Sequence, residues 1–133
     1  MSVVWSMTSL KSGRFSPNER RSELPDLASG FNELRSRGQG YLEVRFPDNA
    51  FPQLTLSFRG DHAVIHLFND EASVSLLVGD GTVSPEVTID VPIMDDLTEF
   101  TGDFILSVHH AWDVVQNFVQ TGTVEGLGEW CEL

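Results

Sequence analysis

The four histidines are the residues of this 133-residue chain whose chemistry is most often catalytic or metal-binding. His62 and His66 lie four apart in a segment with strand-like alternation, which separates their Cα atoms by roughly 13 Å, too far for easy sharing of one ion. His109 and His110 are neighbours in a predicted helix, where adjacent side chains diverge by about 100°. We therefore expect structural histidines, with a hydrolase or isomerase that uses His66 or His109 as the weakest alternative.

Carboxylates are the second set of residues that could do chemistry. Asp95, Asp96 and Glu99 are close enough in sequence to hold an ion weakly, but the calcium-loop spacing of an EF-hand is absent, and a solvated acidic loop is the favoured interpretation. The glycine-rich phosphate loops, the nucleophile elbow and the HExxH zinc motif are also absent. We expect a protein that is not an enzyme and has no metal or cofactor.

The single cysteine, Cys131, excludes an intrachain disulfide, a cysteine-rich zinc site and the zinc-deaminase signature. It is compatible with a reducing compartment, and we expect a cytoplasmic location. The chain contains neither a signal-peptide pattern nor an apolar run approaching the ~18 residues of a membrane span.

Charge is distributed very unevenly. The formal net charge is -12, and all eight Lys and Arg residues lie in residues 1–59. Residues 60–133 hold fourteen acidic residues and neither Lys nor Arg, so these carboxylates have no cation of their own half to pair with. Such a surface repels nucleic acid and anionic membranes and attracts basic proteins, although solubility alone would also explain an acidic composition.

Two helices are predicted by apolar residues at three- and four-residue spacing. The first lies in residues 22–38, with Ser22 as its N-cap and Gly38 at its end. The second lies in residues 107–122, with Ser107 as its N-cap and Gly122 as its C-cap.

Between and before these helices the apolar period is two, which predicts strands. The predicted strands lie in residues 3–7, 41–46, 53–59, 62–68, 73–78 and 86–91, with a last short strand in the tail from Gly128 to Leu133. Residues 8–21 are polar and basic and are expected to form a loop. Residues 1–133 are therefore expected to form a single α+β domain, in which one antiparallel meander of about five to seven strands carries two helices.

The stretch Asp90–Phe104, DVPIMDDLTEFTGDF, is the densest part of the acidic half. Its carboxylates alternate with apolar residues, which is the composition of a surface for a basic partner. The alternative is that Leu97, Phe100 and Phe104 pin a long acidic loop onto the core, and the two interpretations are compatible.

Several separate motifs occur together in residues 40–133. They are the FPxL segment, a strand–turn–strand of the AVIH type, a helix that ends NFVQTG, and a tryptophan-acid terminus, carried by Phe51, Pro52, Leu54, Asp61, Ala63, Val64, His66, Phe118, Thr121, Gly122, Trp130 and Glu132. In this order the pattern resembles the deaminase-toxin immunity proteins of bacterial polymorphic toxin systems. Where relatives often carry Arg-Pro after the last helix, this chain has TVEGLG, Thr123 to Gly128.

The resemblance implies an immunity protein that binds and neutralises a cognate bacterial toxin, and it favours a cytidine deaminase that acts on nucleic acid as that toxin. A toxin of this kind needs a basic groove, which an acidic inhibitor can occlude without binding nucleic acid or membrane itself. An acidic adaptor for another basic protein, or immunity to a nuclease toxin, are the alternatives. The residues expected at the partner surface are Asp70, Glu71, Asp80, Met94, Asp95, Asp96, Leu97, Glu99, Phe100 and Asp103.

Overall fold

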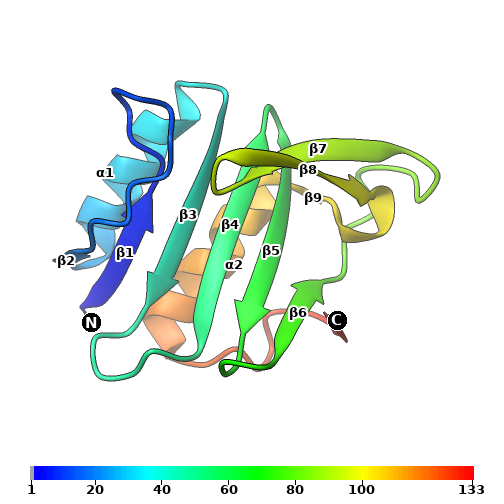
Figure 1. The fold of residues 1–133 in the computed structure, drawn as a ribbon. Coiled ribbons are helices and arrows are strands. Elements are labelled where there is room, and N and C mark those ends of the chain that lie inside the picture. Colours follow the sequence, from blue (N-terminus) through cyan, green and yellow to red (C-terminus); the bar gives the residue numbers. More distant parts are fainter. Residues whose placement is uncertain (1) are drawn as a thin grey trace.

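Most of the strands predicted from alternation form one large sheet in a computed structural model that describes residues 2–133, whereas the strand predicted in residues 86–91 belongs to a separate two-stranded sheet. Every pair of neighbouring strands is antiparallel, and the order across the sheet is β10-β6-β5-β4-β3-β1-β2, with β9 also paired to β5 (Figure 1). The strands of this sheet are β1 (Val3–Met7), β2 (Arg20–Ser22), β3 (Gln39–Arg45), β4 (Gln53–Arg59), β5 (His62–Phe68), β6 (Val74–Leu77), β9 (Leu106–Ser107) and β10 (Trp130–Glu132). The α+β class is confirmed, with more strands than predicted, because residues 20–22 of the expected loop form β2, Leu106–Ser107 form β9, and residues 96–101 form a further strand described below.

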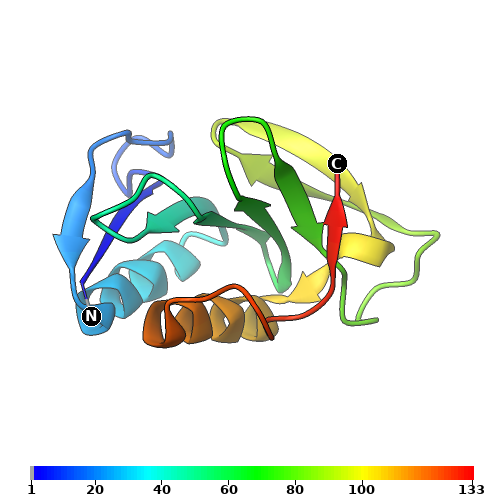
Figure 2. The same ribbon diagram turned by 90° about the horizontal axis from the view of Figure 1, so that it is seen from below.

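Helices α1 (Leu24–Arg35) and α2 (Val108–Thr121) lie side by side on one face of this sheet (Figures 1 and 2). The caps predicted for α2 are confirmed: the Ser107 hydroxyl accepts a hydrogen bond from the His110 N–H, and Gly122 has a φ of 73°. The cap predicted for α1 is wrong. Glu23 occupies the N-cap, and the Ser22 hydroxyl instead accepts a hydrogen bond from Trp5 Nε1 over 2.9 Å.

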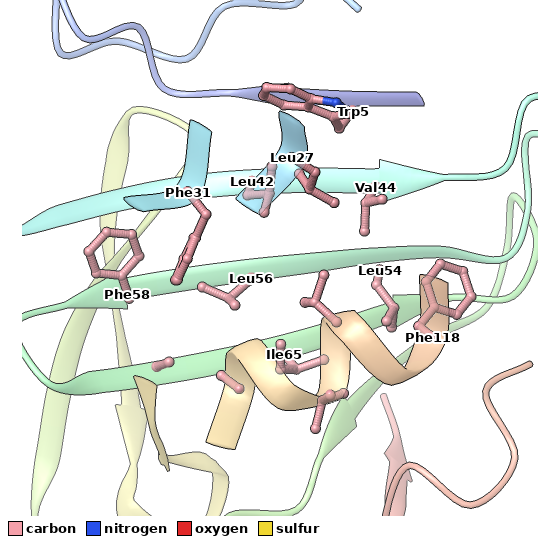
Figure 3. Packing of buried hydrophobic residues seen from close by; sticks show 14 of the residues in the cluster. Trp5, Leu27, Phe31, Leu42, Val44, Leu54, Leu56, Phe58, Ile65 and Phe118 are labelled. Atoms are coloured by element: carbon pink, nitrogen blue, oxygen red, sulfur yellow. The ribbon is translucent and has the colours of Figure 1, made fainter. Parts of the chain in front are cut away.

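The main core lies between the sheet and the two helices (Figure 3). Phe31 of α1 packs edge-on against Phe58 of β4 and stacks on Trp112 of α2, with ring centroids 5.7 and 4.4 Å apart. Fully burying an apolar side chain of this size contributes about 1.5–3 kcal/mol, so this core is the main source of stability. It holds the helical face of the sheet rigidly, which leaves the other face to carry the site described below.

The stretch expected to be a long acidic loop is a β-hairpin. β7 (Thr88–Ile93) and β8 (Asp96–Thr101) pair through Met94 and Asp95, and the short 3-10 helix η1 (Gly102–Phe104) follows. Met94 has a φ of 57°, the conformation that the first central residue of a type II′ turn adopts. This hairpin is a second, separate two-stranded sheet.

A smaller core explains why the hairpin is ordered. It consists of Val64 and Leu76 from the main sheet, Val91 from β7, and Val83 and Ile105 from the flanking segments. These residues lie on the face of the sheet that the helices leave open, so the hairpin covers apolar surface that would otherwise face water. Among residues 2–133, neither helix is long and apolar enough to cross a membrane.

Candidate functional site: the acidic hairpin

The hairpin lies across the open face of the sheet, with β7 in contact with β3, β4 and β5 (Figure 1). Seen from below, β7 lies nearer the sheet and β8 farther out (Figure 2). The burial pattern agrees, because Val91 and Pro92 of β7 are buried while every residue of β8 is at least partly exposed. β8 and the turn that precedes it are therefore the outward side of the acidic stretch.

The hairpin tip is fastened to the basic, N-terminal half of the chain. Asp95 Oδ1 accepts a hydrogen bond from the backbone N–H of Phe15 over 2.6 Å. The same segment is held a second time, because Arg37 donates through Nη1 to the Leu10 carbonyl over 2.5 Å. Asp95 thus has an internal partner that the sequence did not reveal, and part of its negative charge is used within the fold.

The apolar residues of the stretch divide into two groups. Met94 is 47% and Leu97 52% exposed, and both stand on the outer part of the hairpin. Phe100 and Phe104 are half-buried and pack on the smaller core, and the Phe100 ring meets the His66 ring edge-on at 5.6 Å. Core packing is therefore the role of Phe100 and Phe104, whereas Met94 and Leu97 remain open to a partner.

The acidic residues of the hairpin include a directly opposed pair. Asp90 and Glu99 are partners in the β7–β8 ladder, where like charges disfavour pairing. They line a hollow of about 390 Å³ whose other wall is formed by Arg59 and His62, themselves opposed at the ends of β4 and β5. Arg59 makes no ion pair within 4 Å with any described residue, so Asp90 and Glu99 are not in direct contact with the cation that lines the same hollow.

On the hairpin and η1, Asp96, Glu99 and Asp103 are the predicted site acids that are exposed and make no hydrogen bond or ion pair with another described residue through their side chains. Together with Met94 and Leu97 they form a mixed acidic and apolar surface, which we call the hairpin surface. Exposed acids beside exposed apolar groups are the composition expected from the sequence for a basic partner.

Asp80 has an internal structural role that conflicts with its prediction as a contact residue. Its side chain is 15% exposed and accepts hydrogen bonds from the Ser107 N–H at 2.9 Å, from the N–H and hydroxyl of Thr82, and from His110 Nδ1 at 3.2 Å. Burial opposes its ionisation, but these donors outweigh burial and hold the Asp80 pKa well below its usual value. The carboxylate joins the strand that precedes α2 to the loop that follows β6.

Asp70 and Glu71 were expected to border the acidic stretch, and they do not. They form the turn between β5 and β6, at the end of β5 opposite the hairpin (Figure 1). Asp70 Oδ1 accepts hydrogen bonds from the Ala72 and Ser73 N–H groups, both at 2.8 Å, which is the local turn chemistry of an aspartate.

Of the titratable groups on the open sheet face, Tyr41 and Glu43 were not identified as functional residues from the sequence, and His66 was named as a functional residue only in the hydrolase or isomerase alternative. Tyr41 donates through its hydroxyl to Glu43 Oε2 over 2.8 Å, and burial raises the pKa of both groups, although this hydrogen bond partly opposes the rise for Glu43. Burial lowers the pKa of His66 to about 4. Alternation places these residues on the same face of the sheet, but only strand register shows that Glu43, Thr55 and His66 form one row.

In the described part of the chain, no group of three or more His, Cys, Asp or Glu side chains is gathered closely enough to hold a metal ion.

Another hollow, of about 410 Å³, lies at the far end of the sheet between the β3–β4 loop, β2 and the end of α2. Phe46, Phe51 and Pro52 line it, and the FPxL segment contributes two of these residues.

Comparison with known proteins adds no relative to this description: no protein-family model and no curated protein matches the chain.

Proposed function

We propose that the chain is an immunity protein, which binds a basic bacterial toxin domain through the hairpin surface and prevents that toxin from reaching nucleic acid. The single observation that carries the proposal is the arrangement of charge. An acidic half without Lys or Arg presents exposed carboxylates and exposed apolar residues together, on an outward hairpin.

The proposed mechanism is occlusion of the toxin's substrate groove. A groove that holds phosphates is lined by Lys and Arg, and Asp96, Glu99 and Asp103 offer these cations carboxylates in place of phosphates. Leu97 and Met94 supply the apolar contact that excludes water, without which exposed ion pairs contribute little.

A cytidine deaminase acting on DNA or RNA is the toxin class that the sequence resemblance favours. The neutralisation would take place in the cytoplasm of the producing cell, where newly made toxin must be held inactive. Neither the surface nor its charge distinguishes a deaminase from a nuclease, so the class of toxin is to be settled by the assay.

The experiment is inhibition of the toxin domain encoded beside this chain, measured as uracil formation in DNA or RNA and, in parallel, as strand cleavage. An equimolar amount of the protein should abolish one of these activities and should co-elute with the toxin domain in size-exclusion chromatography. A toxin that stays fully active and elutes alone would refute the proposal.

Charge reversal locates the surface. The double variant Asp96→Lys/Glu99→Lys should slow association by about tenfold or more at low ionic strength, with a smaller effect at high salt. The matched control is Glu125→Lys/Glu129→Lys, which makes the same change of charge at exposed positions after α2. Equal effects of the two variants would show that net charge matters and the hairpin does not.

A further inference from the structure

β8 has an unpaired edge. It runs for six residues, Asp96–Thr101, and its only partner strand is β7. In an antiparallel ladder alternate residues direct their N–H and C=O groups away from the partner strand. No described residue makes a hydrogen bond with the outward backbone groups of β8, and β7 separates this strand from most of the main sheet (Figure 2).

The outer edges of the main sheet are shorter. β2 and β10, which end that sheet, have three residues each. β7 lies against β3, β4 and β5, so its free edge has less room for an added strand than the edge of β8. β8 is therefore the longest edge in the described chain to which another strand has room to add.

The devices that normally protect such an edge are absent from β8, except for charge. β8 contains neither lysine nor proline, no helix lies over it in Figure 2, and the N-terminal loop meets the hairpin at its tip, beside Asp95 and Leu97. Asp96 and Glu99 are exposed along its six residues. A second copy of the same edge would bring further carboxylates alongside these two, and the repulsion disfavours pairing between copies.

The same charges favour an occupant with cations. We propose that an extended, cationic segment of the partner protein adds to β8 as a third strand of the hairpin sheet, with backbone hydrogen bonds to its outer edge. This inference rests on the proposed function for the identity of the partner. The ability of β8 to accept an added strand is tested below without the partner.

The ladder register defines what the added strand should carry. Leu97 and Glu99 share one face of the hairpin, and Asp96, Thr98 and Phe100 share the other. Lys or Arg opposite Glu99 and Asp96 would form a cross-strand ion pair on each face, and an apolar residue opposite Leu97 would pack on its side chain. Backbone hydrogen bonds would supply affinity while these side-chain positions supply selectivity, as in other cases of strand addition.

The first test uses a capped eight-residue peptide of lysine and valine, the length of a typical added strand, in which two lysines three positions apart lie opposite Asp96 and Glu99 and a valine lies opposite Leu97. At saturating peptide, alternate amides of β8 should exchange with deuterium about tenfold more slowly or better, measured by NMR. The matched control is the same peptide methylated at every backbone nitrogen, which keeps the charge and removes the donors. Slower exchange with the first peptide alone supports strand addition, whereas equal slowing by both, or by neither, overturns it.

Protein variants provide the second test. Asp96→Lys/Glu99→Lys should remove the protection by the lysine–valine peptide, and Glu125→Lys/Glu129→Lys should leave it intact. If both variants lose protection equally, the peptide binds by net charge and the proposed edge is wrong.

The complex with the toxin domain separates the two proposals. Neutralisation without protection of the alternate β8 amides in the complex would overturn strand addition and leave the proposed function standing. If the peptide protects the β8 amides but the protein neutralises no toxin encoded beside it, the immunity function is refuted, and β8 remains an edge that accepts an added strand.

Discussion

The Asp95 carboxylate accepts a hydrogen bond over 2.6 Å from the backbone N–H of Phe15, a residue 80 positions earlier in the chain. This bond joins the tip of the acidic hairpin to the basic N-terminal half, beside the hydrogen bond from Arg37 to the Leu10 carbonyl. It limits the movement of the hairpin tip, so Met94 and Leu97 are presented in one fixed arrangement. A fixed arrangement reduces the ordering cost of binding a partner.

Removing the Asp95 acceptor should loosen the tip. Asp95→Ala should lower the free energy of unfolding by about 1 kcal/mol and accelerate exchange of the Phe15 amide. Asp95→Asn keeps an acceptor oxygen and should show the smaller loss. If both variants protect the Phe15 amide as well as the wild type does, the hydrogen bond does not hold the tip in solution.

Asp80 should be a stability residue, whatever its role at the surface. Asp80→Ala leaves the Ser107 N–H and Thr82 without their acceptor and should cost about 2 kcal/mol in urea unfolding at pH 7. Because the folded-state pKa lies below the usual 3.8, this stabilisation is complete above that pH and is lost as pH falls further. The difference between wild type and variant should therefore shrink below pH 3.8.

The control for Asp80 is Asp113→Ala, an exposed carboxylate on α2. It should change stability by less than about 0.5 kcal/mol. If Asp113→Ala lowers the free energy of unfolding as much as Asp80→Ala does, the loss comes from removing any carboxylate near α2 and not from the hydrogen bonds of Asp80.

His66 should make stability depend on pH between 6.5 and 4. The folded protein holds His66 neutral, with its pKa lowered to about 4, whereas the unfolded chain takes up a proton near 6.5. Stability is complete above 6.5 and falls as pH decreases, because the unfolded state then binds more protons. From pH 7.5 to 5 the loss should be about 2 kcal/mol.

The variant His66→Phe keeps a ring beside Phe100 and cannot titrate. Its unfolding free energy, measured in urea at both pH values, should fall by less than that of the wild type. Glu43, whose pKa is raised, acts in the opposite direction in both proteins, so the difference between them isolates His66. The same pH dependence in wild type and variant would contradict the assignment.

Gly102 should tolerate no side chain. A Cβ at this position would lie 2.0 Å from the Ser84 carbonyl oxygen and 2.6 Å from that of Val83. Gly102→Ala should therefore destabilise by about 3 kcal/mol and displace the segment that leads into β7. Thr101→Ala, at an exposed neighbouring position, is the control, and thermal unfolding of both variants measures the difference.

Much of the main sheet and both helices were predictable from sequence, for local reasons. Alternation in residues 53–59 and 62–68 predicted β4 and β5, and the residues that cap α2 lie within its own sequence neighbourhood. The hairpin was predicted only in part. Its turn has Met94 at a positive φ, where glycine or asparagine is the usual residue, so the sequence carries no turn signal before the second strand and predicts a loop there.

The sequence by itself determined the charge of the two halves, because carboxylate and guanidinium counts do not depend on folding. It did not determine which acids are available to a partner. Asp80 and Asp95 are both aspartates, and the sequence does not distinguish them. In the fold, Asp80 accepts hydrogen bonds from Thr82, Ser107 and His110, whereas Asp95 accepts one from Phe15 of a remote segment.

Only the tertiary structure decided that Asp96, Glu99 and Asp103 stay exposed, as Met94 and Leu97 do, while Phe100 packs on the smaller core. The physical reason is that exposure depends on what covers a residue. For this stretch the covering groups come from β5, from the loop after β6 and from the N-terminal segment, each distant in sequence and brought together by the fold.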